Sequence, residues 1–393
     1  MKCILMNKNI EVLIAEYNNI SKFFDEIIDI KNIDYATYVL KKIYLEKSED
    51  LRIVLTNWFK GRGIPSWRDR LDILLYRLNI ESVEDLLDKS FGLSLSDQYW
   101  IKPYDSNIKY DDINFFDHDF DSADFLDATF TERTFTVTND ASLRTPNNTT
   151  DGMLRKTWII ENGKRYLLKG GYKNDIMQPF NEVLATEICK RLNFEHVKYT
   201  LDIVKGRVVS KCECLTTKDN EIIPASQIIR GEKKNKSILD YENYIKILEN
   251  NGIKGAREKL ENMYILDYLI MNEDRHLNNF GVIRDVNTLK WVNVCPIFDN
   301  GMALNVNYYD DSTIVTEGNG RLFYEIKSFD EIIKVVKNIK RIDISKLDTV
   351  VEWFDNLLHK YQHITKISDD RISRLCYLLN RQIDKLKILI ENS

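Results

Sequence analysis

The stretch Met271-Asn272-Glu273-Asp274-Arg275-His276-Leu277-Asn278-Asn279-Phe280-Gly281 is the most informative part of this 393-residue chain. It directly follows an apolar helix that the sequence predicts over Gly255–Met271, and it gathers acids, a base, an imidazole and amides into a few residues. Asp274 and Asn279 have the D-x-x-x-x-N spacing of a loop that pairs a proton-accepting carboxylate with a metal-binding amide. Acid–amide pairs at this spacing also occur by chance. The spacing therefore supports a functional loop only if other segments carry matching residues.

Three further charged residues, two before this loop in the sequence and one after it, support the interpretation of the loop. Downstream, Asp299 leaves a short strand into the turn Asp299-Asn300-Gly301, the D-x-G form of a metal-binding turn. Upstream, Lys169 ends a predicted strand, and Glu182 lies in the first turn of a helix predicted over Asn181–Leu192, with Asn181 as its N-cap.

This order of Lys, Glu, Asp, Asn and Asp fits phosphoryl transfer, which depends on positioning and charge neutralisation. A strand lysine can hold the phosphates of a nucleotide, and a helix glutamate can hold that lysine. Asp274 can take the proton of an acceptor hydroxyl, while Asn279 and Asp299 offer the oxygen ligands that Mg²⁺ prefers. The sequence therefore predicts a kinase-like site.

The remaining pattern predicts an α+β protein in three parts. Residues 1–130 open with a hairpin around Asn7-Lys8-Asn9 and are otherwise expected to be mostly helical from Ile20 to Leu95, with no assigned role. Residues 131–215 are β-rich and form an expected N-lobe, with hairpin turns at Asn162-Gly163 and Lys205-Gly206. Residues 216–393 form an expected helical C-lobe.

An aspartate-rich connector between Asp105 and Asp127 marks the first boundary. Its run of Asp117, Asp119, Asp121 and Asp124 invites a calcium interpretation, but it lacks the glycine and the final glutamate of an EF-hand loop. An irregular connector anchored by aromatic side chains is the favoured alternative.

The composition is typical of a globular protein and argues against a nucleic-acid-binding or membrane-spanning chain. Hydrophobic residues are 44% and charged residues 30% of the chain, as in globular proteins, and the net charge of −5 argues against a general nucleic-acid footprint. Six scattered cysteines favour reduced, buried thiols. No apolar run reaches the roughly 20 residues of a membrane helix, so a cytoplasmic location without membrane attachment is expected.

Four blocks of this sequence resemble the HipA-like serine/threonine kinases. They are Gly152-Met153-Leu154-Arg155-Lys156, the strand end at Lys169, the helix start Asn181-Glu182, and Asp274–Phe280 with the downstream Pro296–Asp299. The resemblance covers about residues 131–305. It implies a two-lobed protein-kinase-like fold, here with a mostly helical N-terminal extension.

The resemblance also implies roles for individual residues. Asp274, Asn279 and Lys169 would be catalytic, with Asn279 and Asp299 as Mg²⁺ ligands and His276 as a brace for the loop. The cofactor-binding set would be Gly152, Lys156, Lys169, Glu182 and His276, together with the adenine-contacting segment Lys211, Cys212 and Glu213. Thr149 would occupy the place of an autophosphorylated serine.

The resulting hypothesis is an ATP- and Mg²⁺-dependent protein serine/threonine kinase acting as a toxin or stress regulator. A small DNA-binding antitoxin, encoded separately, would be its partner. Two alternatives stay open at this point: a pseudokinase or nucleotide-binding interaction module without turnover, and a kinase for a small molecule or lipid.

Overall fold

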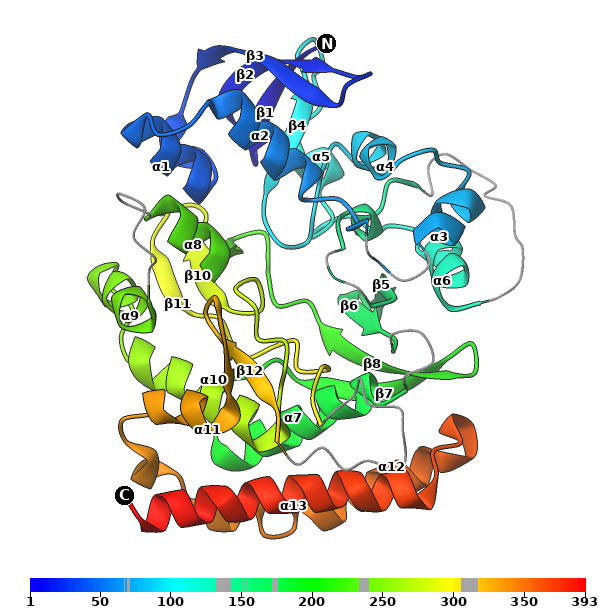
Figure 1. The fold of residues 1–393 in the computed structure, drawn as a ribbon. Coiled ribbons are helices and arrows are strands. Elements are labelled where there is room, and N and C mark those ends of the chain that lie inside the picture. Colours follow the sequence, from blue (N-terminus) through cyan, green and yellow to red (C-terminus); the bar gives the residue numbers. More distant parts are fainter. Residues whose placement is uncertain are drawn as a thin grey trace. The chain divides into compact units, whose positions relative to one another are not determined.

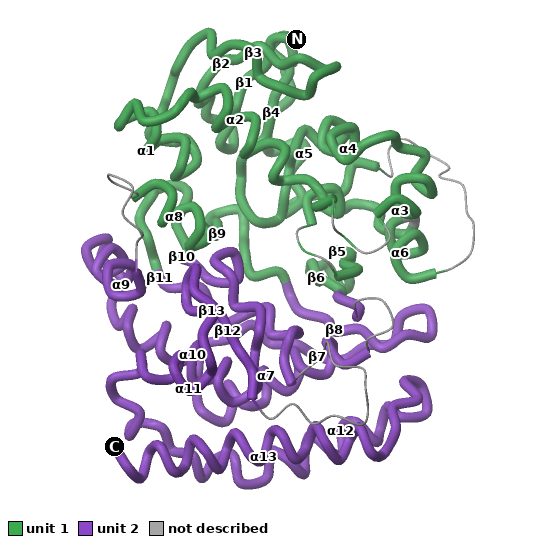
Figure 2. Tube along the Cα trace, in the orientation of Figure 1, with its two compact units in different colours: residues 1–168, 214–238, 282–292 green, residues 169–213, 239–281, 293–393 purple. Residues whose placement is uncertain are grey.

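The computed structural model describes residues 1–66, 68, 71–131, 143–150, 152, 154–171, 176–232, 240–304 and 317–393. The chain divides into two compact units, each built from separated segments (Figure 2). Unit 1 comprises residues 1–168, 214–238 and 282–292, and unit 2 comprises residues 169–213, 239–281 and 293–393.

Unit 1 begins with a four-stranded sheet of order β3-β2-β1-β4 (Figure 1). Its strands are β1 (Lys2–Asn7), β2 (Ile10–Asn18), β3 (Phe23–Ile30) and β4 (Tyr99–Pro103). The predicted β1–β2 hairpin is present and turns at Lys8, which has a φ of +48°.

Strand β3 contradicts the helix predicted from Ile20 onward. Its apolar residues Phe24, Ile27 and Ile28 have the i, i+3, i+4 spacing of a helix face. In the sheet, however, the pairing of β3 with β2 shifts register twice, between Ile14 and Ala15 and between Glu16 and Tyr17. Such bulges break the alternation that identifies a strand, and this explains the wrong prediction.

The helices of unit 1 are short and pack around this sheet and the segments that follow it. Three begin at side-chain caps: Thr37 accepts from the Leu40 N–H, Asp50 from the Arg52 N–H, and Ser82 from the Asp85 N–H. These helices are α1 (Tyr38–Glu46), α2 (Leu51–Lys60), α3 (Leu71–Leu78), α4 (Val83–Lys89), α5 (Tyr110–Ile113), α6 (Ala123–Phe130) and α8 (Ala225–Gly231).

Two further strand groups lie wholly or mostly in unit 1. Strands β5 (Lys156–Glu161) and β6 (Lys164–Lys169) form the hairpin predicted at Asn162-Gly163, where both turn residues have positive φ. Strands β9 (Asn220–Pro224), β10 (Gly281–Asp285) and β11 (Trp291–Val294) form a sheet of order β11-β10-β9.

The aspartate-rich connector contains the short helices α5 and α6 and is anchored by buried Tyr110, Phe115 and Phe125. In the described part of the chain, no group of three or more His, Cys, Asp or Glu side chains is arranged to hold a metal ion. The buried aromatic side chains agree with the aromatic-anchored connector, and the calcium interpretation stays untested.

Unit 2 is mainly helical and is built around α10 (Ala256–Ile270), whose residues from Leu260 to Ile270 are all buried. The long helix α13 (Asp369–Glu391) lies beside α12 (Val350–Thr365) in Figure 1. The other elements are α7 (Gln178–Leu192), β7 (Tyr199–Val204), β8 (Arg207–Glu213), α9 (Tyr241–Asn250), β12 (Asn319–Leu322), β13 (Glu325–Ser328) and α11 (Phe329–Ile332).

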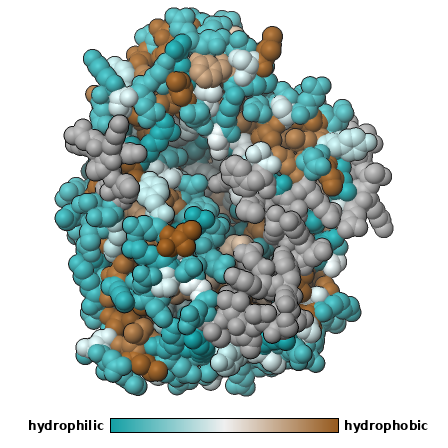
Figure 3. All heavy atoms as spheres, viewed as in Figure 1, coloured by the Kyte–Doolittle hydropathy of each residue, from teal (hydrophilic) through white to brown (hydrophobic). Residues whose placement is uncertain are grey.

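Short 3₁₀ turns complete the structure, at Ile33–Tyr35 and Pro146–Thr149 in unit 1 and at Ile333–Val335, Ile339–Arg341 and Ile344–Leu347 in unit 2. No helix among the described residues is long and apolar enough to cross a membrane. On the face shown in Figure 3, exposed apolar side chains form separate small patches.

Two features of unit 2 differ from the sequence predictions. Helix α7 begins at Gln178, so Asn181 is not its N-cap but lies inside the first turn. The β12–β13 hairpin was not predicted, because its strands, with the sequences NGRL and EIKS, show no clear alternation of apolar and polar residues.

Candidate active site

Lys169 is the centre of a buried group of charges in unit 2. The residue is 2% exposed, and its ammonium group contacts the carboxylates of Glu182 on α7 and of Asp299, the latter at 2.5 Å. Burial alone would lower the pKa of Lys169, but the two carboxylates outweigh this effect and hold the pKa above its usual value. The lysine therefore stays charged.

Asn300 links this lysine group to the loop after α10. Its backbone N–H donates to the second oxygen of Glu182 at 2.9 Å, and its side-chain oxygen accepts from Arg275 at 2.5 Å. Glu182 is thus held from both sides, and the turn at Asp299 is tied to the Asp274–Asn279 loop.

Arg275 fixes the course of that loop from within. It is 1% exposed and forms a two-point ion pair with Asp267 of α10, at 2.9 and 3.0 Å. Its remaining donors reach the carbonyl oxygens of Asn279 and Phe298 at 3.1 and 2.6 Å. One buried guanidinium therefore joins α10, the loop and the segment that leads to Asp299.

Asp274 lies at the open side of the loop. Its backbone is held by Asn272, whose side-chain oxygen accepts from the Asp274 N–H, and by His276, whose N–H donates to the Asp274 carbonyl. Burial raises the pKa of Asp274; His276 opposes the rise and the negative charge of Asp299 adds to it. A carboxylate with a raised pKa is a stronger base for an acceptor hydroxyl.

His276 braces the loop rather than pointing away from it. Its Nδ1 accepts from the Asn278 N–H at 3.2 Å, so Nε2 carries the proton in the neutral ring and lies 3.9 Å from Asp274 Oδ2. The role that the resemblance implies for His276 stays a prediction.

Asn279 and Asp299 offer oxygen atoms of the kind that Mg²⁺ takes. The Nδ2 group of Asn279 donates to the Asp274 carbonyl at 3.0 Å, which leaves its amide oxygen as the atom for a cation. Asp299 uses Oδ1 for Lys169 and sits at a φ of +56°, a conformation that turns the chain sharply at this point. Two protein oxygens suit Mg²⁺, which commonly keeps waters and phosphate oxygens as its other ligands.

Asn181, predicted as a helix cap, instead holds the turn that follows Asp299. Its Nδ2 donates to the carbonyl oxygens of Gly301 and Ala303 at 2.9 and 2.7 Å. This role depends on a contact between residues 120 positions apart, which the local capping pattern could not indicate.

Gly152 and Lys156 are brought together, as a phosphate loop requires. Gly152 has a φ of +93°, and a β-carbon there would lie 2.6 Å from the Lys156 ammonium. Both residues belong to unit 1, whereas the other predicted site residues belong to unit 2. Asp151 and Met153 lie outside the described residues, and a role of this loop in ATP binding stays a prediction.

Thr149, considered as an autophosphorylation site, is buried in unit 1. Its hydroxyl lies 3.1 Å from the carbonyl oxygens of Leu93 and Pro146. The neighbouring Thr150 is held by the buried Arg68, which also donates to the Gly152 carbonyl. In this conformation the Thr149 hydroxyl is turned into the protein.

The segment predicted to contact adenine forms the end of β8. Lys211 lies 3.5 Å from Asp202 on β7, Cys212 is buried and Glu213 is exposed. Just before them, the Ser210 hydroxyl donates to the Lys169 carbonyl at 3.4 Å, so β8 lies next to the site lysine. Adenine binding here also stays a prediction.

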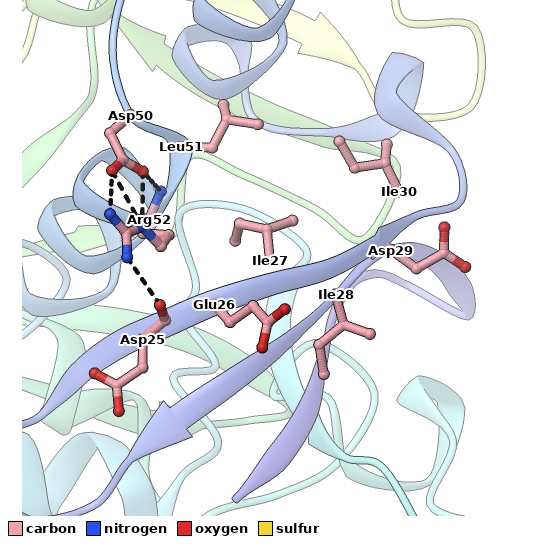
Figure 4. A pocket seen from close by; sticks show the side chains of 9 residues that line it. All are labelled: Asp25, Glu26, Ile27, Ile28, Asp29, Ile30, Asp50, Leu51 and Arg52. Atoms are coloured by element: carbon pink, nitrogen blue, oxygen red, sulfur yellow. Dashed lines mark hydrogen bonds and ion pairs between the residues drawn. The ribbon is translucent and has the colours of Figure 1, made fainter.

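A surface hollow elsewhere in unit 1 has no part in this site. It is lined by Asp25 to Ile30 of β3 and by Asp50 to Arg52 at the start of α2 (Figure 4). Arg52 pairs with Asp50 and donates to the Asp25 carbonyl at 3.1 Å, which covers part of this sheet edge.

The chain is similar to known proteins at low sequence identity. No protein-family model matches the chain. A stretch of 132 residues is 26% identical to the serine/threonine-protein kinase CtkA of Helicobacter pylori strain J99, covering 32% of this chain and 40% of that protein. The chain therefore matches less than half the length of this curated relative.

Two solved structures are similar. The crystal structure of the H. pylori proinflammatory kinase CtkA has a TM-score of 0.48 at 19% identity, over 61% of this chain and 90% of that chain. HipA of Shewanella oneidensis MR-1, in its complex with HipB and operator DNA, has a TM-score of 0.52 at 11% identity, over 98% of this chain and 96% of that chain.

The fold and the buried lysine group therefore define a protein with a protein-kinase-like fold. More particularly, its fold is similar to that of HipA, whose structure matches nearly the full length of the chain. The α+β, HipA-like fold predicted from the sequence is confirmed.

Proposed function

We propose that this protein is an ATP- and Mg²⁺-dependent protein serine/threonine kinase. The observation that carries the proposal is the buried contact of Lys169 with both Glu182 and Asp299, adjoining the Asp274–Asn279 loop. Lys169 and Glu182 are buried and Asp299 is half-buried, and taking such charges out of water is costly for stability. A site that must neutralise phosphate charge requires such a group of charged side chains, and this requirement explains why the group is present.

Each residue has a definite role in this proposal. Lys169, kept charged by its two carboxylate neighbours, would hold the phosphates of ATP. Asp274 would accept the proton of a serine or threonine hydroxyl as that oxygen attacks the γ-phosphorus in line and ADP leaves. Asn279 and Asp299 would hold Mg²⁺, which when bound supplies charge neutralisation at the phosphate oxygens.

The test of the proposal is transfer of label from γ-labelled ATP to the protein itself or to an added acceptor such as myelin basic protein. We expect labelling with Mg²⁺ and none with EDTA. Labelling equally strong in EDTA would contradict the metal requirement. No labelling, with ATP still raising the melting temperature, would favour the pseudokinase alternative.

The metal ligands lead to a separate prediction on binding. ATP with Mg²⁺ should stabilise the wild-type protein by about 2.7 kcal/mol at a concentration of 100 Kd, and EDTA should remove most of this gain. Asp299→Asn should lose the Mg²⁺-dependent part, because a neutral amide is a poorer ligand for a hard cation. Thermal unfolding with ATP, Mg²⁺ and EDTA measures this. Exposed Asp384 on α13 provides the control, and Asp384→Asn should behave as the wild type.

We also propose a small, separately encoded DNA-binding partner for the chain, acting as antitoxin to a toxin kinase. The support is the HipA neighbour, whose structure contains HipB and operator DNA. We expect a small DNA-binding protein to co-purify with the chain from its native host. Purification in the absence of any such protein would count against this partner.

A further inference from the structure

The β12–β13 hairpin brings a cation to the proposed catalytic base. Arg321 Nε lies 3.4 Å from Asp274 Oδ1, and the two side chains remain 44% and 35% exposed. An ion pair this open to solvent adds only about 0–1 kcal/mol to stability. Stability therefore gives little reason for placing a guanidinium at this carboxylate.

The position of Arg321 is firmly set by the hairpin around it. Phe323, at the hairpin turn, is buried among Tyr241, Tyr244 and Phe280, with ring centroids 6.1, 5.3 and 5.8 Å away. These edge-to-face contacts anchor the turn in unit 2.

Gly320 brings the same strand close to the loop. A β-carbon at Gly320 would lie 2.8 Å from the Phe329 ring and 3.3 Å from the Asn272 carbonyl, so a larger residue does not fit. Arg321 therefore projects from a strand that packs against the start of the catalytic loop, and its distance from Asp274 follows from the fold.

The loop itself lacks another exposed guanidinium or ammonium group. Arg275 is buried and paired with Asp267, and Lys169 is held on the far side by Glu182 and Asp299. Among the described residues, the cationic groups within 4 Å of the Asp274 carboxylate belong to His276 and Arg321. Arg321 is the one that is charged at every physiological pH.

We propose that Arg321 is a further catalytic residue, whose guanidinium donates hydrogen bonds to the transferring γ-phosphoryl oxygens. The proposal rests on the proposed kinase function. As the bond from the acceptor oxygen to phosphorus forms and the bond to ADP breaks, the acceptor proton passes to Asp274. Arg321 leaves its resting ion pair with Asp274 and stabilises charge on the equatorial oxygens, a task that suits a planar guanidinium.

The test compares Arg321→Ala and Arg321→Lys with a matched control on the same hairpin. Arg321 pairs across the hairpin with Ile326, whereas Lys327 pairs with Gly320, so Lys327 projects from the opposite face. Lys327 contacts Glu325 and is partly exposed. Lys327→Ala should leave transfer from γ-labelled ATP to myelin basic protein unchanged.

We expect Arg321→Ala to lower kcat about 100-fold or more, the usual effect of removing one donor to a transition-state oxyanion. The KM for ATP should stay within about twofold, and Arg321→Lys should restore part of the rate because it keeps the charge but not the fork of donors. The melting temperature should not change in any of the three variants.

A second measurement does not depend on an acceptor. Binding of Mg²⁺, ADP and aluminium fluoride together, which mimics the transferring phosphoryl group, should weaken at least about tenfold in Arg321→Ala, while binding of Mg²⁺ and ADP alone should not.

Three results would overturn the proposal. One is a kcat of Arg321→Ala within about threefold of the wild type, and another is equal affinity of both proteins for the aluminium fluoride complex. The third is a raised KM for the acceptor with unchanged kcat, which would make Arg321 a residue for acceptor binding. In all three cases the wild-type protein remains active, so these results contradict the role of Arg321 and not the proposed kinase function. An inactive wild-type protein would contradict both proposals.

Discussion

Asp274→Asn is expected to slow phosphoryl transfer by about 10²–10⁴-fold, the range by which positioned general bases contribute. Asparagine keeps the shape of the side chain but cannot accept the proton of the acceptor hydroxyl. The backbone bonds of residue 274, to Asn272 and His276, do not depend on the carboxylate, so the loop should keep its course.

ATP binding should survive this substitution. The groups proposed to hold the nucleotide and the metal, Lys169, Asn279 and Asp299, keep their side chains, and removing the negative charge of Asp274 does not weaken attraction for phosphate. Labelling from γ-labelled ATP measures transfer, and the ATP-dependent rise in melting temperature measures binding. A variant with transfer within tenfold of the wild type would show that Asp274 is not the base.

The residues of the site could be predicted because each of them carries a local signal. Lys169 ends a strand, and Asp299 has the positive φ of the predicted turn. The sequence also placed Glu182 on the correct helix, although α7 begins earlier than predicted from Asn181–Glu182, at Gln178. Phosphoryl transfer requires these residue types at one site. The proposed reaction therefore predicted contacts between segments that are far apart in the sequence. The structure brings Lys169, Glu182 and Asp299 into contact.

The residues that hold the site together could not be predicted in the same way. Asn181 and Asp267 act through partners that only the folded chain brings near them. Arg321 reaches Asp274 from a hairpin whose four-residue strands give no clear alternation. Sequence reasoning therefore found the groups that are proposed to contact substrate, and it missed the residues that hold these groups in place.

The hairpins show the same difference. Turns that depend on the local sequence could be predicted, and a strand whose shape depends on its pairing partner could not. The turns at Asn162-Gly163 and Lys205-Gly206 were correctly predicted, because both residues of each turn adopt positive φ and the turn chemistry is local. Strand β3 was missed because its bulges are set by pairing with β2, which the sequence of β3 does not reveal.

The largest loss of stability is expected from Arg275→Met. The variant removes the guanidinium that pairs with Asp267 and leaves that carboxylate buried, with the Asn272 amide as its remaining described side-chain donor. Removing one partner of a buried ion pair costs about 3–5 kcal/mol. For a unit of this size the melting temperature should fall on the order of 10 °C.

A second ion pair of unit 2 provides a matched control. Arg257 and Glu242 are 2.5 Å apart, closer than the 2.9 Å of Arg275 and Asp267, but their side chains are 28% and 45% exposed against 1% and 3%. The pKa of Glu242 is lowered to about 2 by its bond to Arg257, yet solvent screens this pair. Arg257→Met should therefore cost no more than about 1 kcal/mol.

The contrast between the two pairs separates burial from contact distance as the cause of the effect. If distance decided the outcome, Arg257→Met would be at least as harmful as Arg275→Met. Replacing both members of the buried pair, Arg275→Met with Asp267→Leu, should recover part of the loss, because no charge is then left without a partner. Melting temperatures of the four proteins test this. Equal destabilisation by the two arginine variants would show that the Arg275–Asp267 pair does not hold unit 2 together as its geometry implies.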